Sequence, residues 1–169
     1  NEADCRAIVL AALKAKTIFA VCHVMRYTVY TRQLKAIVSS GRIGELVSMQ
    51  HLEPVGYWHQ AHSFVRGNWR NERESSFMLL SKSCHDMDWI RHIVGRRCVK
   101  VSSFGNLFHF RKDRKPKEAG DAKRCTSCPH EPNCAYSALK LYVMHAEKGY
   151  FYWPVDVVTT ERTVEGVMK

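Results

Sequence analysis

The sequence predicts a fold of the α/β class, and three observations support this prediction. The chain has 169 residues, of which 46% are apolar, a size and composition typical of a globular domain with its own core. Apolar residues recur at helical spacing in some segments and alternate with polar residues in others. The first helical segment runs directly into a short apolar segment, an order typical of helices that cover a sheet.

The first two elements predict the closing pair of an α/β unit. Residues 2–16 have helical spacing, with an apolar stripe that contains Ile8, Val9, Ala12 and Leu13. Residues 17–22, "TIFAVC", then predict a short buried strand, because they leave no room for a second helix.

The next segments predict a helix, a strand and a functional loop. Residues 30–44 are amphipathic, with Leu34, Ile37 and Val38 facing inward and Gly41 as the stop signal. Residues 45–55 alternate as in a strand. Residues 56–76 form a long segment rich in Trp, His and Arg, and long ordered loops are usually functional.

The second half of the chain predicts three further helices and one strand. Helical patterns cover residues 77–94 and 135–149, and a third begins within 159–169. Residues 98–110 alternate as in a strand. With three or four strands in all, we expect a sheet flanked by helices, and the ends of the chain suggest a part of something larger.

Charge and cysteine content limit the class of protein. The net charge is +10, from 26 basic and 16 acidic residues, which suits nucleic acid, an anionic cofactor or plain solubility. The densest run, residues 111–124, holds seven basic and three acidic residues without aromatics, so we expect a solvated loop and rank a nucleic-acid-binding module low.

Seven cysteines, an odd number, suggest free thiols in the cytoplasm. The longest apolar stretches fall short of the ~20 residues that a membrane helix needs.

Ionisable residues run through the middle of the predicted helix at 77–94. At helical spacing, His85 lies one turn from both Lys82 and Asp88, and His92 extends the same face. A histidine with such neighbours can act as a general acid or base. The same pattern also fits a charged surface stripe, whereas a metal site on this face lacks a third strong ligand nearby.

A cysteine cluster follows the basic run. Cys125 and Cys128 form a Cys-x-x-Cys pair, Cys134 can supply a third ligand, and His130 or Cys98 a fourth. The spacing favours a structural zinc site over an iron–sulfur cluster, and free thiols or a local disulfide remain the alternative.

Two stretches resemble the Gfo/Idh/MocA family of NAD(P)-dependent oxidoreductases. "IFAVCHVMRYTVYTRQLKAIVSSGRIGELVSMQH" is similar to the last Rossmann strand, an Arg-aromatic segment, a helix, Gly-x-Ile-Gly and the first strand of the second domain. "GNWRNERESSFMLLSKSCHDMDWIRHIVG" is similar to the segment of that family with Trp-Arg, Gly-Gly and Asp-x-Gly-x-His-x-x-Asp. The order of these motifs makes the resemblance specific.

The resemblance implies an architecture, a cofactor and a partner. Residues 1–24 would end an NAD(P)-binding Rossmann-like domain, and residues 25–169 would form part of an α+β substrate and dimerisation domain with a mainly antiparallel sheet. Family members usually form homodimers through that sheet. The chain contains no Gly-x-Gly-x-x-Gly, so we expect the NAD or NADP pyrophosphate loop to lie upstream of Asn1 and the isolated chain to bind the cofactor weakly.

The resemblance also assigns roles to residues of the helix at 77–94. The family's catalytic histidine falls on His85, with Lys82 as its expected assistant. The family's Asp falls on Ser81 and its Gly pair on Ser75 and Ser76, so the usual relay is altered, and Lys82 or a loop histidine would take its place.

The predicted binding residues lie before that helix. The resemblance and the position after a predicted strand place His23, Arg26 and Tyr27 beside the nicotinamide. The loop residues expected to contact a polyol-like or sugar-like substrate are Trp58, His59, His62, Trp69 and Arg70. The sequence therefore predicts an oxidoreductase of polyols or sugars, and the alternative is a non-catalytic binding or scaffold domain of the same family.

Overall fold

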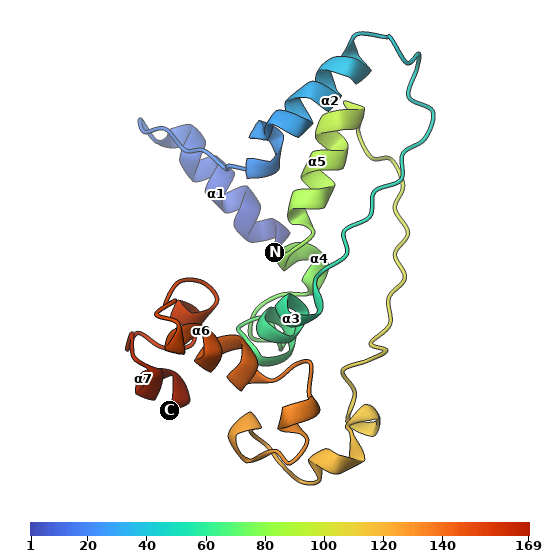
Figure 1. The fold of residues 1–169 in the computed structure, drawn as a ribbon. Helices are drawn as coiled ribbons and strands as arrows, with labels where there is room; N and C mark the ends of the chain where they lie inside the picture. Colours follow the sequence, from blue (N-terminus) through green and yellow to red (C-terminus); the bar gives the residue numbers. More distant parts are fainter. The chain divides into compact units, whose positions relative to one another are not determined.

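The computed structural model describes residues 1–169, and every regular element in it is helical (Figure 1). The α-helices are α1 (Glu2–Lys14), α2 (Val29–Ser39), α3 (Tyr57–Gln60), α4 (Met78–Ser81), α5 (Cys84–Val94), α6 (Met144–Glu147) and α7 (Val164–Met168). The 3₁₀ turns are η1 (Val24–Tyr27), η3 (Lys112–Arg114), η4 (Lys117–Ala119), η5 (Cys125–Ser127), η6 (Glu131–Asn133) and η8 (Val155–Val157), and the π-helical segments are η2 (Ala61–Arg66) and η7 (Leu139–Val143).

The predicted α/β fold is therefore wrong for this structure, and so is the mainly antiparallel sheet. The segments 17–22, 45–55 and 98–110 contain no strand. Alternation favours an extended backbone, but a strand exists only where its N–H and C=O groups pair with a neighbouring strand. Val47 (95%), Val99 (91%) and Phe104 (96%) are almost fully exposed, so these segments also lack a buried face.

The chain divides into two compact units. The first comprises Asn1–His51 and Cys84–Cys98, and the second comprises Leu52–Ser83 and Val99–Lys169. Each unit is described by itself below. The domain boundaries that the resemblance implies, 1–24 and 25–169, stay a prediction.

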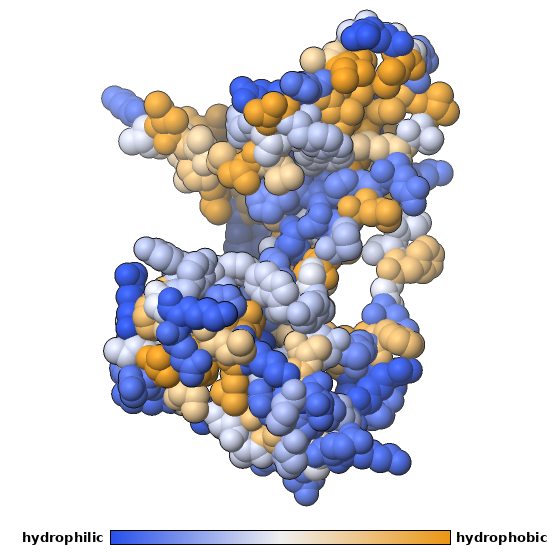
Figure 2. Space-filling model, viewed as in Figure 1, coloured by the Kyte–Doolittle hydropathy of each residue, from blue (hydrophilic) through white to orange (hydrophobic).

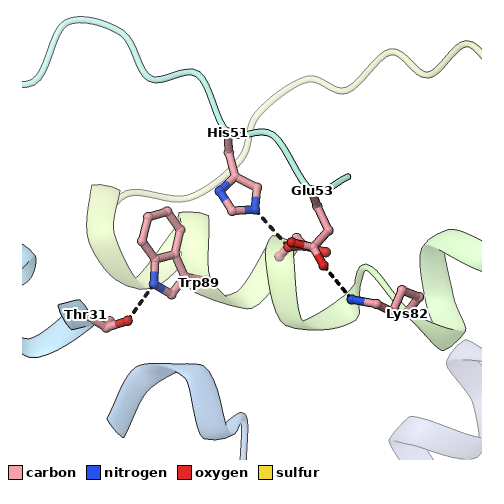
Figure 3. Close-up of polar contacts among 6 residues, drawn as sticks. Thr31, His51, Glu53, Lys82 and Trp89 are labelled. Atoms are coloured by element: carbon pink, nitrogen blue, oxygen red, sulfur yellow. Dashed lines mark hydrogen bonds and ion pairs between the residues drawn. The ribbon is translucent and has the colours of Figure 1, made fainter. Parts of the chain in front are cut away.

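The first unit is held together by the packing of α2 against α5. Trp89 of α5 is 8% exposed, and its ring stacks on Tyr30 with centroids 6.4 Å apart. Its indole Nε1 donates a hydrogen bond of 2.8 Å to Oγ1 of the fully buried Thr31 (Figure 3). Lys35 Nζ adds a 3.1 Å hydrogen bond to the carbonyl oxygen of Ile93. A buried indole with a satisfied N–H fixes how the two helices meet.

Helix α1 confirms the predicted helix but not the burial of its stripe. Asn1 caps it through a capping box with Asp4. None of its residues is buried, and Ile8 (49%) and Leu13 (78%) are exposed. Figure 2 shows apolar side chains of the first unit at the surface. The stripe therefore contributes little to the stability of this chain.

The second unit has a small core near the C-terminus. Tyr142 of η7, Ala146 of α6, Val155 of η8 and Val167 of α7 are buried together, each 9% exposed or less. Of the helix predicted over 135–149, residues 139–147 are helical, as the π-helical η7 followed directly by α6. Helix α7 confirms the helix predicted to begin within 159–169.

Two segments depart from the predicted secondary structure. Residues 77–94 form two helices rather than one, because the chain breaks at Lys82 and Ser83, where Lys82 has φ −119°. Residues 56–76, predicted as a loop, begin with α3 and η2. Both departures change which side chains share a face, and both fall within the expected site.

The N-cap of α2 supports a stability prediction. Thr28 Oγ1 accepts a 3.2 Å hydrogen bond from the backbone N–H of Thr31 and lies 2.8 Å from the Thr31 hydroxyl. Replacing Thr28 with Ala removes this cap, so we expect the free energy of unfolding to fall by about 1 kcal/mol in urea titrations. Thr28→Ser keeps the hydroxyl, so it should lower the free energy of unfolding by only roughly a few tenths of a kcal/mol. Equal stabilities of the three proteins would contradict the role of the cap.

Candidate functional site

The centre of the candidate site in the first unit is a pair of histidines. His85 lies in the first turn of α5, and His23 precedes η1. Their rings meet edge to face with centroids 5.7 Å apart. Both side chains are half-buried, and the Nδ1 atom of each ring is buried without a hydrogen-bond partner. Since buried polar atoms are nearly always paired, two unpartnered ring nitrogens side by side mark this place as a candidate site.

An ion pair lies beside the two histidines. Arg26 Nε donates a 2.6 Å hydrogen bond to Asp88 Oδ2, and a second guanidinium nitrogen of Arg26 contacts the other carboxylate oxygen. Such a two-point contact fixes both groups. The hydrogen bonds from Arg26, its charge and the nearby His23 and His92 lower the pKa of Asp88, against a raising effect of burial. The hydrogen bond to Asp88 and its charge likewise raise the pKa of Arg26.

The lowered pKa of Asp88 predicts a dependence of stability on pH. Its carboxylate has an ordinary pKa near 3.8, which the folded state lowers, so the unfolded chain binds more protons in that range. The stability from this pair is present above the ordinary pKa and is lost as the pH falls through the folded one. In urea titrations between pH 7 and pH 3, we expect Asp88→Asn to flatten this acid limb. A limb as steep as that of the parent chain would contradict the prediction.

A second carboxylate on α5 is also paired. Asp86 is 9% exposed, and its Oδ1 lies 2.8 Å from Nε2 of His51, in the contact drawn in Figure 3. The His51 ring also packs against Trp89, with centroids 5.0 Å apart. The sequence analysis missed His51, because nothing in its spacing links it to a helix 35 residues later.

The structure gives Lys82 and Tyr27 different surroundings from those expected. Lys82 lies at the break after α4, in the second unit, where its Nζ is 2.7 Å from Glu53 Oε1 (Figure 3). Helical spacing from Lys82 to His85 therefore does not apply. Of the three predicted cofactor residues, His23 and Arg26 adjoin α5, while the Tyr27 side chain is 64% exposed.

An aromatic cluster in the second unit gathers three of the predicted substrate residues. Trp58, His59 and His62, on α3 and η2, surround Trp153, with ring centroids 5.3, 5.3 and 5.5 Å from its ring. His62 Nδ1 lies 2.7 Å from the Tyr142 hydroxyl.

Burial and nearby charges lower the pKa of the two histidines of this cluster, which favours their neutral forms. Desolvation is the main cause that lowers the pKa of both His59 and His62. The charge of Lys82 adds to the effect on His59, which Glu53 opposes, and the charge of Arg66 adds to that on His62. Imidazoles among aromatic rings are groups that can pair with the hydroxyls of a ligand.

The other two predicted substrate residues lie apart from this cluster. Trp69 packs against Phe64, with centroids 6.3 Å apart, and Arg70 pairs with Glu74 at 3.7 Å. Sequence reasoning missed Trp153, whose only signal is the aromatic run "YFYW" at residues 150–153.

The cysteine cluster lies on consecutive turns around η5 and η6. Cys125, Cys128 and Cys134 are half-buried free thiols, and Cys125 Sγ accepts a hydrogen bond from the backbone N–H of Ala138 at 3.4 Å. These three sulfurs and His130 provide no set of three ligand atoms within 4.8 Å of one another. The alternative fourth ligand, Cys98, belongs to the first unit. Zinc binding stays a prediction.

Comparison with known proteins identifies the family. Residues 31–125, more than half of the chain, match the GFO/IDH/MocA C-terminal domain. The chain belongs to this family. This match confirms the resemblance found in the motifs around His85. The family domain is normally rich in sheet, in contrast to the helical structure described above.

A curated relative supports the same assignment. The chain is 25% identical over 135 residues to the Putative oxidoreductase YteT of Bacillus subtilis (strain 168). The alignment covers 79% of this chain and 31% of that protein, so the chain spans about a third of the relative's length. No solved structure matches the chain significantly. None of the helices is both long and apolar enough to cross a membrane.

Proposed function

We propose that the protein containing this chain is an NAD(P)-dependent oxidoreductase that acts on a hydroxyl or carbonyl group of a polyol or sugar. The observation that carries the proposal is the buried, unpartnered Nδ1 of His85 beside His23, in a chain of this oxidoreductase family. A half-buried imidazole whose ring nitrogen has no protein partner can act as a general acid or base.

In this proposal the four site residues of the first unit each have a defined task. The bound NAD(P) would accept or supply the hydride. His85 takes the proton from the substrate hydroxyl in the oxidation direction and returns it in the reduction direction. The ion pair of Arg26 and Asp88 holds α5 against η1 and so keeps His85 near His23. His23 supplies a second free ring nitrogen for the substrate or the nicotinamide amide.

Several finer properties belong to the same proposal. We propose a homodimer in the cytoplasm, a compartment that suits a chain with an odd number of cysteines, seven in all. We also propose a structural zinc on Cys125, Cys128 and Cys134, where the N–H···S bond from Ala138 would stabilise a thiolate. Zinc would fix the loop between η5 and η6. Elemental analysis of the purified protein tests it, and a content well below one zinc per chain would contradict it.

A specific observation favours the second candidate, a non-catalytic binding domain. Ser81 stands where the family has an Asp, and its hydroxyl donates a 3.2 Å hydrogen bond to the carbonyl oxygen of Phe77 within α4. It therefore has no carboxylate to offer and is already paired.

One experiment separates the two candidates. The complete protein is titrated with NADH and NADPH by fluorescence, and NAD(P)+ reduction is then measured with a panel of polyols and sugars. Binding with turnover supports the oxidoreductase, whereas binding without turnover on the panel supports the non-catalytic domain. Failure to bind either cofactor would overturn both the cofactor and the reaction.

A further inference from the structure

A cavity in the second unit is lined by basic and aromatic residues and by no acidic one. Its volume is about 350 Å³, and its basic residues are Arg66 at the end of η2, Lys140 of η7 and His145 of α6. The aromatic residues are Tyr57, Trp58 and Tyr136. The volume lies in the range of cavities that hold small molecules. Three basic groups without a lining carboxylate favour an anion.

Arg66 has one side-chain donor, Nε, that lacks a partner. Its Nη1 donates a 2.5 Å hydrogen bond to the carbonyl oxygen of Tyr136, and its guanidinium lies 5.5 Å from the centroid of the Tyr142 ring. Its Nε is buried without a hydrogen-bond partner, and Arg66 forms no ion pair. A buried arginine donor without an acceptor is costly, and a carboxylate or phosphate would satisfy it.

His145, which lines the same cavity, also has an unpartnered ring atom. Its Nδ1 is buried without a hydrogen-bond partner, and its ring is fixed against Tyr150, with centroids 5.6 Å apart. Lys140 is held near the cavity by hydrogen bonds from its Nζ to the carbonyl oxygens of Pro132 (2.6 Å) and Cys134 (3.3 Å). Arg66 and Lys140 both belong to π-helical segments, which are frequent at functional sites.

We infer that this cavity binds an anionic sugar, one that carries a carboxylate or a phosphate. The Arg66 guanidinium and the Lys140 ammonium bind the anionic group, and the His145 ring pairs with a hydroxyl. The faces of Trp58 and Tyr136 contact the apolar side of the sugar ring. The choice of a sugar rests on the proposed function, whereas the preference for an anion rests on the cavity alone.

Calorimetric titration of the full chain tests the inference in the absence of cofactor. The probes are glucuronate, glucose 6-phosphate and neutral glucose, at low salt. We expect at least one anionic probe to bind at least tenfold more tightly than glucose, and the affinity to fall with added salt. Comparison of the affinities for glucuronate and glucose 6-phosphate shows whether the cavity prefers a carboxylate or a phosphate. Equal affinity for all three probes, or binding of none, would overturn the inference.

Matched variants locate the binding. Arg66→Gln should weaken anion binding tenfold or more, while Lys148→Gln, an exposed lysine after α6 and outside the cavity, should leave it unchanged. If Arg66→Gln fails to fold, Lys140→Gln, on an exposed side chain, should still weaken binding severalfold. Unchanged affinity in a folded Arg66 or Lys140 variant would also overturn the inference.

The outcome is separate from that of the proposed function. Anion binding without NAD(P)+ reduction leaves the cavity assigned and removes the reaction. Turnover of neutral polyols without anion binding would support the reaction and overturn the assignment of the cavity.

Discussion

Replacing His85 with Asn in the complete protein should lower turnover by about 10²- to 10⁴-fold and leave NAD(P)H binding intact. The size is that of a lost general acid or base. Asn keeps a polar group of similar size at the start of α5 but does not accept and release protons near neutral pH. Steady-state rates and fluorescence titration of the cofactor measure the two effects independently.

The matched control lies on the same helix. Arg91 is exposed on α5, about two-thirds of a turn around the helix from His85, and takes part in no ion pair. Arg91→Gln should therefore keep full turnover. Circular dichroism of both variants adds a second measurement, because a loss of turnover in a folded His85→Asn protein points to the chemistry and not to the fold. Full turnover in His85→Asn would remove the assigned role, whatever the cofactor affinity.

The sequence correctly predicts the parts that depend on local pattern. The helix around Leu34 follows from 3.6-residue periodicity and is present as α2, and the segment around Tyr142 is also helical, although η7 is a π-helix. The family follows from the order of motifs around His85, and the match over residues 31–125 confirms it. Local pattern suffices because each of these inferences needs only neighbours along the chain.

Strand pairing could not be predicted in the same way, and the strands predicted from alternation are absent from this structure. Alternation around Val47, Val99 and Phe104 shows a preference for an extended backbone, but pairing is a property of two segments together. In this structure these residues are exposed and no ladder forms. Periodicity indicates a preference for extended backbone but does not show which segment, if any, would pair with it.

The candidate site shows the same division between local and distant contacts. The sequence placed His85 and Asp88 on one helix, but it did not predict that Arg26, 62 residues earlier, pairs with Asp88. It also assumed an unbroken helix through Lys82, and the break there redirects that side chain to Glu53. Trp153 and Arg66 contact residues far away in the sequence, and the spacing of residues along the chain does not predict such contacts.

Replacing Trp89 with Ala should lower the free energy of unfolding by about 3–5 kcal/mol, the largest stability effect expected for this chain. Trp89 is 8% exposed, stacks on Tyr30 and donates to Thr31, so truncation opens a cavity between α2 and α5. It also leaves the hydroxyl of Thr31, which is 0% exposed, without the indole donor. Urea titration followed by circular dichroism measures the loss.

Two further variants separate the causes of that loss. Trp89→Phe keeps most of the buried ring area but removes the N–H, so it should cost about 1 kcal/mol for the hydrogen bond plus a smaller packing loss. Met87→Ala, on the same helix but 55% exposed, should change stability by no more than about 0.5 kcal/mol. Since α5 carries both Trp89 and His85, Trp89→Ala should also reduce turnover at temperatures where the chain is still folded. A Trp89→Ala protein as stable as Met87→Ala would show that the contact between α2 and α5 does not hold this unit together.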